Sequence, residues 1–239
     1  MSDSAVGVVG DPAVADRLRA AGAAVVEGTV DSVPTTERVV AVGRRAVRAV
    51  ATAVVDPLVV PVDAGRGLRS VTRDAVPDAV SGLDDAFTER HPLFEVDVTG
   101  EAVGTAAFDV TAVTEEAARI SEYAVATTTD SVGQFRADGV TLATPAGSPG
   151  YARRVGGPVF APAESVGVVA PIAPFQTNPD HWVVSLDGLS VSVERDEATV
   201  ALYADGDAVA TVACGESAQL CRSGTLRVAV LEESCSRFR

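Results

Sequence analysis

The hydrophobic pattern of this chain changes near residue 87, and that change restricts the possible folds more than any other feature. Before it, short apolar runs alternate with helical segments, and Asp11-Pro12 supplies a helix N-cap followed by proline at the first helical position. Alternation of this kind is typical of βαβ units around a parallel sheet. The predicted strands are Val6–Val9, Ala23–Val26, Arg38–Val42 and Leu58–Val62, and the predicted helices are Ala13–Ala21, Arg44–Val55 and Arg73–Leu83.

After residue 87, β-branched residues alternate with polar ones, and Asp-Gly or Thr-Gly pairs separate the segments, which indicates antiparallel strands. The segments are 94–99, 123–128, 182–186, 189–193 and 199–203. We therefore predict two domains, an α/β domain over residues 1–86 with a Rossmann-like parallel sheet and an antiparallel β-sandwich over residues 87–239.

Composition excludes several classes of function. The 239 residues carry a net charge of −14, and all 19 basic residues are arginine. Such a surface repels nucleic acid and anionic lipid, so we expect neither as a partner. It resembles proteins that work in a high-salt cytoplasm, although a dedicated cationic partner would also fit. The N-terminus has no basic or hydrophobic signal region, which predicts a cytoplasmic protein.

The cysteines and histidines do not predict a metal site. Cys214, Cys221 and Cys235 match no zinc-binding spacing, and their odd number argues against a disulfide framework. His91 and His181 each stand apart from them in the sequence. We predict no metal held by these residues.

One segment, residues 138–158, combines a predicted strand with a loop rich in glycine, proline and hydroxyl side chains. It reads Asp-Gly-Val-Thr-Leu-Ala-Thr-Pro-Ala-Gly-Ser-Pro-Gly-Tyr and ends in Gly-Gly-Pro. Glycine lets backbone amides approach a ligand closely, so such a loop can hold a polar ligand. An ordinary turn-rich connection between strands has the same composition.

The order of residues in this segment resembles the NAD kinase family. The family pattern runs Asp-Gly, a short strand, Thr-Pro-Thr-Gly-Ser-Thr-Ala-Tyr and then Gly-Gly-Pro, and residues 138–158 keep that register. Pro171-Ile172-Ala173-Pro174, Asp205-Gly206 and the Thr114-Glu115 pair match further family positions in order. The resemblance covers about residues 108–207.

The resemblance implies that the β domain holds NAD or NADP. Glu115 would hydrogen-bond a ribose or adenine edge, Asp138 and Tyr151 would line the nucleoside pocket, and Arg136 would lie close by. The hydroxyls of Thr144 and Ser148 would lie near the ligand. The alternatives are a simple turn at Asp138, a core ring at Tyr151, and solvated surface charges at Glu115 and Arg136.

The chain departs from the family where the family uses an acidic phosphate loop, Gly-Gly-Asp-Gly. Here Gly43-Arg44-Arg45 follows the predicted strand, and Arg45 occupies the aspartate position. Arginine cannot accept a proton, but it can bind phosphate. Asp63, after the next strand, is the carboxylate that could substitute as base, unless it only caps the following turn.

By this resemblance the chain transfers a phosphoryl group from ATP or polyphosphate to the adenosine ribose 2′-hydroxyl of NAD, with Mg²⁺. The alternative is an NAD(P)-binding sensor without turnover, because the base is missing. The family also implies a homo-oligomer, a nucleotide between the domains, and last strands around Leu226–Leu231 that return to the first domain.

Overall fold

The computed structural model describes residues 5–116, 119–162, 166–195 and 198–239. Contacts divide the chain into two compact units: unit 1 contains Met1–His91 and Thr225–Arg239, and unit 2 contains Pro92–Gly224. The division falls at His91, five residues beyond the expected boundary at residue 86, because strand β5 (Phe87–Val98) continues through it. Strand β16 (Ser217–Val230) likewise begins in unit 2 and ends in unit 1.

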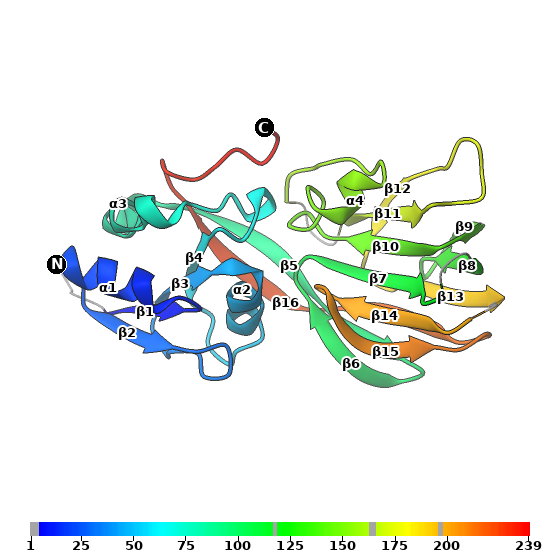
Figure 1. Ribbon diagram of the computed structural model, residues 1–239, viewed down its shortest axis with the longest axis horizontal. Coiled ribbons are helices and arrows are strands. Elements are labelled where there is room, and N and C mark those ends of the chain that lie inside the picture. Colours follow the sequence, from blue (N-terminus) through cyan, green and yellow to red (C-terminus); the bar gives the residue numbers. More distant parts are fainter. Residues whose placement is uncertain (1–4, 117–118, 163–165, 196–197) are drawn as a thin grey trace. The chain divides into compact units, whose positions relative to one another are not determined.

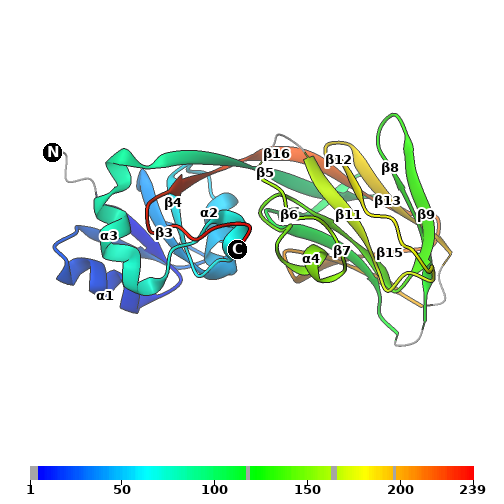
Figure 2. The same cartoon turned by 90° about the horizontal axis from the view of Figure 1, so that it is seen from above.

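Unit 1 is built on a parallel sheet with the strand order β2-β1-β3-β4, and the last part of β16 pairs with β4 in parallel. Helices α1 and α3 pack in one apolar cluster with alternate strand residues, while α2 packs on β3 and β4 outside that cluster (Figure 2). The elements are β1 (Val6–Val9), α1 (Pro12–Ala20), β2 (Val25–Gly28), β3 (Arg38–Val42), α2 (Gly43–Ala51), β4 (Leu58–Val62), α3 (Val76–Ser81), and the 3-10 helices η1 (Arg66–Leu68), η2 (Arg73–Ala75) and η3 (Leu83–Asp85).

Unit 2 is a sandwich of two antiparallel sheets (Figure 1). One sheet has the order β12-β11-β10-β7-β14-β15, and the other pairs β9, β8 and β13 with the first part of β16. Apolar residues from both sheets form a single core. The elements are β6 (Glu101–Ala106), β7 (Asp109–Thr114), β8 (Ser121–Ala126), β9 (Ser131–Ala137), β10 (Gly139–Ala143), α4 (Tyr151–Arg154), β11 (Val166–Ile172), β12 (Trp182–Ser185), β13 (Leu189–Arg195), β14 (Val200–Ala204) and β15 (Asp207–Val212).

This architecture confirms the expected fold class, an α/β fold joined to a β-sandwich. Two predicted helices are shorter than expected. The segment predicted as a helix over Arg44–Val55 is α2, which ends at Ala51, where Thr52 caps it by hydrogen-bonding back to Arg48 and Ala49. The segment 73–83 divides into η2 and α3, because proline lies at the N-terminus of α3 and Gly82 ends it.

Candidate functional site

The turn Ala107–Asp109 is fixed by the carboxylate of Asp205. The amides of Ala107, Phe108 and Asp109 donate to its two oxygens at 2.9, 2.7 and 3.0 Å. Burial raises the pKa of Asp205, and these three hydrogen bonds act in the opposite direction. The Asp205-Gly206 pair seen in the sequence is therefore more than a turn, because its carboxylate orders a second segment nearly one hundred residues earlier.

The 144–150 loop, which follows β10, is built on this turn. The Thr144 amide donates to the Phe108 carbonyl at 2.9 Å, and the Thr144 hydroxyl donates to the Ala107 carbonyl at 2.7 Å. A Cβ atom on Gly147 would lie 2.0 Å from the Phe108 oxygen, so only glycine fits there. The loop is thus held against the turn through its backbone.

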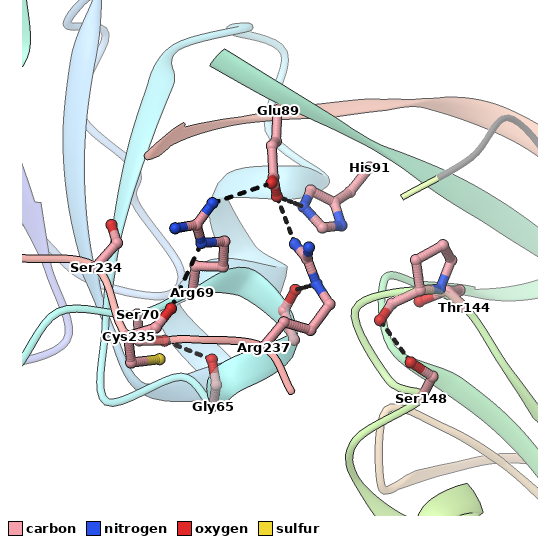
Figure 3. Close-up of polar contacts among 12 residues, drawn as sticks. Gly65, Arg69, Ser70, Glu89, His91, Thr144, Ser148, Ser234, Cys235 and Arg237 are labelled. Carbon is pink, nitrogen blue, oxygen red and sulfur yellow. Dashed lines mark hydrogen bonds and ion pairs between the residues drawn. The ribbon is translucent and has the colours of Figure 1, made fainter. Parts of the chain in front are cut away.

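The two hydroxyls predicted to lie near a ligand are used inside the loop. Thr144 Oγ1 also accepts from the Gly147 amide at 3.2 Å, and Ser148 Oγ donates to the Pro145 carbonyl at 3.0 Å (Figure 3). Both side chains are buried, at 2% and 0% exposure. They shape the loop, and their direct contact with a ligand stays a prediction.

Tyr151 begins the short helix α4, directly after the loop. Its side chain is 41% exposed, whereas the next residue, Ala152, is buried. The alternative of a core aromatic residue therefore does not hold, because a large part of Tyr151 is accessible to solvent. Strand β10, the 144–150 loop and α4 follow one another in the expected order.

Asp138 lies at the start of β10, at the opposite end from the 144–150 loop. Its amide donates to the Ile172 carbonyl at 3.0 Å and its carbonyl accepts from the Thr114 amide at 2.8 Å. At a rise of about 3.4 Å per residue, the six steps from Asp138 to Thr144 span about 20 Å. The structure therefore separates the predicted residues of unit 2 into two groups along one strand.

Glu115 and Arg136 lie in the group near Asp138. Glu115 is exposed and directly follows Thr114, whose hydroxyl turns inward to Ser121 at 2.9 Å and Tyr123 at 3.0 Å. Arg136 is half-buried on β9, opposite Glu122 of β8. Glu115 follows Thr114, whose amide donates to the Asp138 carbonyl, and Arg136 precedes Asp138 by two residues, so one carboxylate and one guanidinium lie at this end of unit 2.

In unit 1, Arg44 and Arg45 form the first turn of α2. Gly43 adopts φ of 82° where β3 turns into the helix, and both arginines are exposed. This turn, which the structure describes in full, contains no acidic residue. Positive charge at a helix N-terminus opposes the helix dipole, so an anion would be stabilising there.

Asp63 is bound in an ion network at the end of β4. Its carboxylate pairs with Arg73, and Arg73 Nε also contacts Asp11 at 3.1 Å. Asp11 in turn caps α1 by accepting from the Ala13 amide at 3.0 Å. Arg73 engages one of the two carboxylate oxygens of Asp63.

Unit 1 contains a buried charge cluster that the sequence analysis did not predict. Glu89 on β5 accepts from Arg237 and contacts His91 at 3.3 Å and Arg69 at 3.7 Å. Burial raises the pKa of Glu89, but hydrogen bonds from His91 and Arg237 outweigh it and hold this pKa at about 2. Burial lowers the pKa of His91. The one available signal was that Glu89 and His91 share a face of a strand.

The described residues contain no group of three or more His, Cys, Asp or Glu side chains placed to hold a metal ion. In unit 1, the carboxylates of Asp11 and Asp63 both form ion pairs with Arg73. Because both already pair with a cation, they do not form a ready site for a Mg²⁺ ion held by the protein alone. No helix in the described part of the chain is long and apolar enough to span a membrane.

Residues 109–230 match the ATP-NAD kinase C-terminal domain family. An NAD kinase of Methanosarcina acetivorans is 32% identical over 133 residues, which cover 52% of this chain and 48% of that protein. An NAD kinase of Chlorobium limicola is 36% identical over 89 residues, covering 37% and 31%. The chain thus spans half or less of the length of these curated relatives.

Two of the solved structures that share the fold are NAD or NADH kinases. The crystal structure of an NAD kinase from Archaeoglobus fulgidus in complex with ATP has a TM-score of 0.74 at 21% identity, and covers 98% of this chain and 96% of that one. Yeast NADH kinase complexed with NADH has a TM-score of 0.76 at 14% identity, covering 96% and 84%.

Proposed function

Because the chain belongs to the NAD kinase family, we propose that it phosphorylates NAD to NADP at the adenosine ribose 2′-hydroxyl, with ATP or polyphosphate as donor. The observation that carries the proposal is the 144–150 loop, which carries the family's motif. Gly147 packs closely against Phe108, and Asp205 fixes the Ala107–Asp109 turn on which the loop is built. Two relatives bearing the name NAD kinase are 32% and 33% identical over 52% and 45% of the chain. The neighbouring structures bound to ATP and NADH support a nucleotide as the ligand.

The residues of each unit suit different parts of this reaction. In unit 2, the exposed ring of Tyr151 offers a stacking face for a nucleoside. Asp138 and Glu115 would accept hydrogen bonds from a ribose or base, and Arg136 would balance negative charge. In unit 1, Arg44 and Arg45 at the N-terminus of α2 would neutralise phosphate charge, which is the main requirement of phosphoryl transfer.

The phosphoryl donor would supply Mg²⁺ together with its phosphates. Mg²⁺ typically binds through substrate phosphates and one or two carboxylates. The described residues hold no preformed cluster for Mg²⁺. The protein side chains would therefore bind the nucleotides and neutralise their phosphate charge. Deprotonation of the 2′-hydroxyl by Asp63 would use a carboxylate that already pairs with Arg73 through Oδ2.

A second function, NAD(P) binding without turnover, is favoured by one specific observation. The first turn of α2 contains two arginines and no carboxylate, and the substitute base Asp63 is paired with Arg73. A sensor or regulatory module needs the binding groups but no base.

Formation of NADP distinguishes these two functions. The purified chain would be incubated at high salt with Mg²⁺, NAD or NADH, and ATP or polyphosphate, and NADP(H) would be measured with an NADP-specific enzyme. The proposal predicts NADP formation by the wild type that falls sharply in Tyr151→Ala. Binding of NAD without any NADP formation with either donor would support the sensor instead.

The assembly and the cellular location are part of the same proposal. The family implies a homo-oligomer, which light scattering of the purified chain would test. The net charge of −14 and the absence of lysine suit a high-salt cytoplasm.

A further inference from the structure

The C-terminal tail, residues 231–239, is bound along one loop of unit 1. The amide of Cys235 donates to the Ser70 carbonyl at 3.2 Å, and Arg69 Nε donates to the Cys235 carbonyl at 3.4 Å. Arg237 Nε donates to the Gly67 carbonyl at 3.1 Å. Three hydrogen bonds thus attach residues 235 and 237 to the segment 67–70.

Arg237 is the buried residue of the C-terminal tail. Its side chain is 5% exposed. Its guanidinium bridges the Gly67 carbonyl and the carboxylate of Glu89, which also contacts His91 and Arg69 (Figure 3). A buried guanidinium requires such a partner, because an unpaired buried charge is strongly destabilising.

The loop that the tail holds, residues 63–70, has a strained backbone. Asp63 and Arg69 adopt positive φ values of 48° and 54°, a region that side chains disfavour. Within the loop, the Ala64 amide donates to Ser70 Oγ at 3.1 Å, and Ser70 Oγ donates to the Gly65 carbonyl at 2.8 Å. Strained backbone persists only where its surroundings fix it, and the tail supplies part of that constraint.

The position of the 63–70 loop gives this constraint a function. It follows β4 at the carboxyl edge of the parallel sheet, where ligands of open α/β sheets bind, and it begins with Asp63. We propose that Arg237 is a positioning residue, which holds the 63–70 loop through Gly67 and Glu89 in the conformation that nucleotide binding requires. The inference rests on the proposed function of a nucleotide-binding kinase.

The test compares Arg237→Ala and Arg237→Lys with the wild-type full chain. Phe238→Ala is the matched control, because Phe238 lies in the same tail but is 61% exposed. Hydrogen exchange of the 63–70 amides measures loop order without ligand, and calorimetric titration of NAD and of ATP measures affinity. Initial rates of NADP formation separate KM from kcat.

Arg237→Ala should speed exchange of the 63–70 amides and weaken the affinity for at least one nucleotide about tenfold, which corresponds to loss of about one charged hydrogen bond. KM should rise more than kcat falls. Arg237→Lys should recover part of the affinity, because an ammonium keeps the pair with Glu89 but not the two-sided guanidinium contact. Phe238→Ala should match the wild type in all readings.

Two results would overturn the inference. One is unchanged exchange of the 63–70 amides in Arg237→Ala, and the other is faster exchange with unchanged affinity for both nucleotides. If Arg237→Ala does not fold, Arg237→Lys carries the same comparison. A wild-type chain that binds neither NAD nor ATP would instead refute the proposed function and this inference together, which is a different result from a variant without effect.

Discussion

At the scale of single residues, the candidate site depends on backbone contacts more than on side chains that face a ligand. Gly147 lies against the Phe108 carbonyl, and the hydroxyls of Thr144 and Ser148 donate hydrogen bonds to backbone carbonyls. The shape of the 144–150 loop therefore depends on side chains that are buried or tightly packed. Tyr151 differs from them, because its ring is exposed at the end of the loop.

We predict that Gly147→Ala destabilises the protein and weakens NAD binding. The new methyl group would lie 2.0 Å from the Phe108 oxygen, and overpacking of this kind costs about 1–3 kcal/mol of unfolding free energy. Chemical denaturation would measure it. In Gly82→Ala the nearest atoms would lie 3.7 Å away, so this control should stay close to wild type. Equal stability of the two variants would contradict the packing described for the loop.

We predict that Tyr151→Ala reduces the rise in Tm caused by NAD or NADP while leaving the Tm of the free protein nearly unchanged. A ligand that binds only the folded state stabilises it, and loss of an aromatic stacking face costs about 1–3 kcal/mol of binding. Thermal shift titration would measure the effect. Phe87→Ala, which truncates a 68% exposed ring in unit 1, should leave the shift unchanged. An undiminished shift in Tyr151→Ala would remove Tyr151 from the site.

At the scale of elements, sequence periodicity predicted where strands and helices lie but not how far they extend. Strands β3 and β4 agree with their predicted ranges, because their valine-rich runs end at glycine, proline or acidic residues. Strand β5 was predicted only from Phe94, although it begins at Phe87, since residues 88–91 are polar and Pro92 follows them. No local pattern could show that Arg237 would meet Glu89, 148 residues earlier in the chain.

In the candidate site too, contacts between residues distant in sequence could not be predicted. The motif order located the 144–150 loop and α4 correctly, because glycine, proline and hydroxyl residues specify local backbone shape. It could not show that the hydroxyls of Thr144 and Ser148 turn inward. That outcome depends on the Ala107–Asp109 turn, which is distant in sequence and held by Asp205.

We predict that Arg45→Asp raises the stability of α2 and removes a preference for NADP over NAD. A carboxylate in the first turn interacts favourably with the helix dipole, by about 0.3–1 kcal/mol, whereas a guanidinium fork favours a 2′-phosphate. The carboxylate of Asp63 would repel a 2′-phosphate, so the preference for NADP is expected to be small. Arg48→Asp, in the last turn, makes the same charge change with the opposite dipole effect and is the control. Calorimetric titration showing equal NAD and NADP affinities in the wild type would reject the preference.

We predict that Glu89 makes the protein acid-sensitive. Its pKa in the folded state is about 2, below the ordinary value of 4.5, so its stabilising effect is complete above pH 4.5 and disappears as the pH falls towards 2. Measurements of Tm against pH should show a flatter decline in this range for Glu89→Gln. Glu232→Gln, an exposed carboxylate of the C-terminal tail, should keep the wild-type decline. Parallel declines in both variants would exclude Glu89 as the source.

At the scale of the whole molecule, the two units carry different amounts of the family signal. The match to the ATP-NAD kinase C-terminal domain lies at residues 109–230, mostly in unit 2, which contains the 144–150 loop. Unit 1 has a parallel sheet, and Arg44 and Arg45 lie at the position where the resemblance predicts an acidic loop. Nucleotide binding is thus best supported by unit 2, and turnover depends on what unit 1 can still supply.

Hydrogen exchange of the full chain with and without NAD tests whether NAD binds at the 144–150 loop and α4. Bound NAD should slow exchange at residues 144–157 and near Asp138, and the effect at 144–157 should be lost in Tyr151→Ala. Bound NAD that leaves residues 144–157 unprotected, with protection confined to other segments, would contradict this binding site.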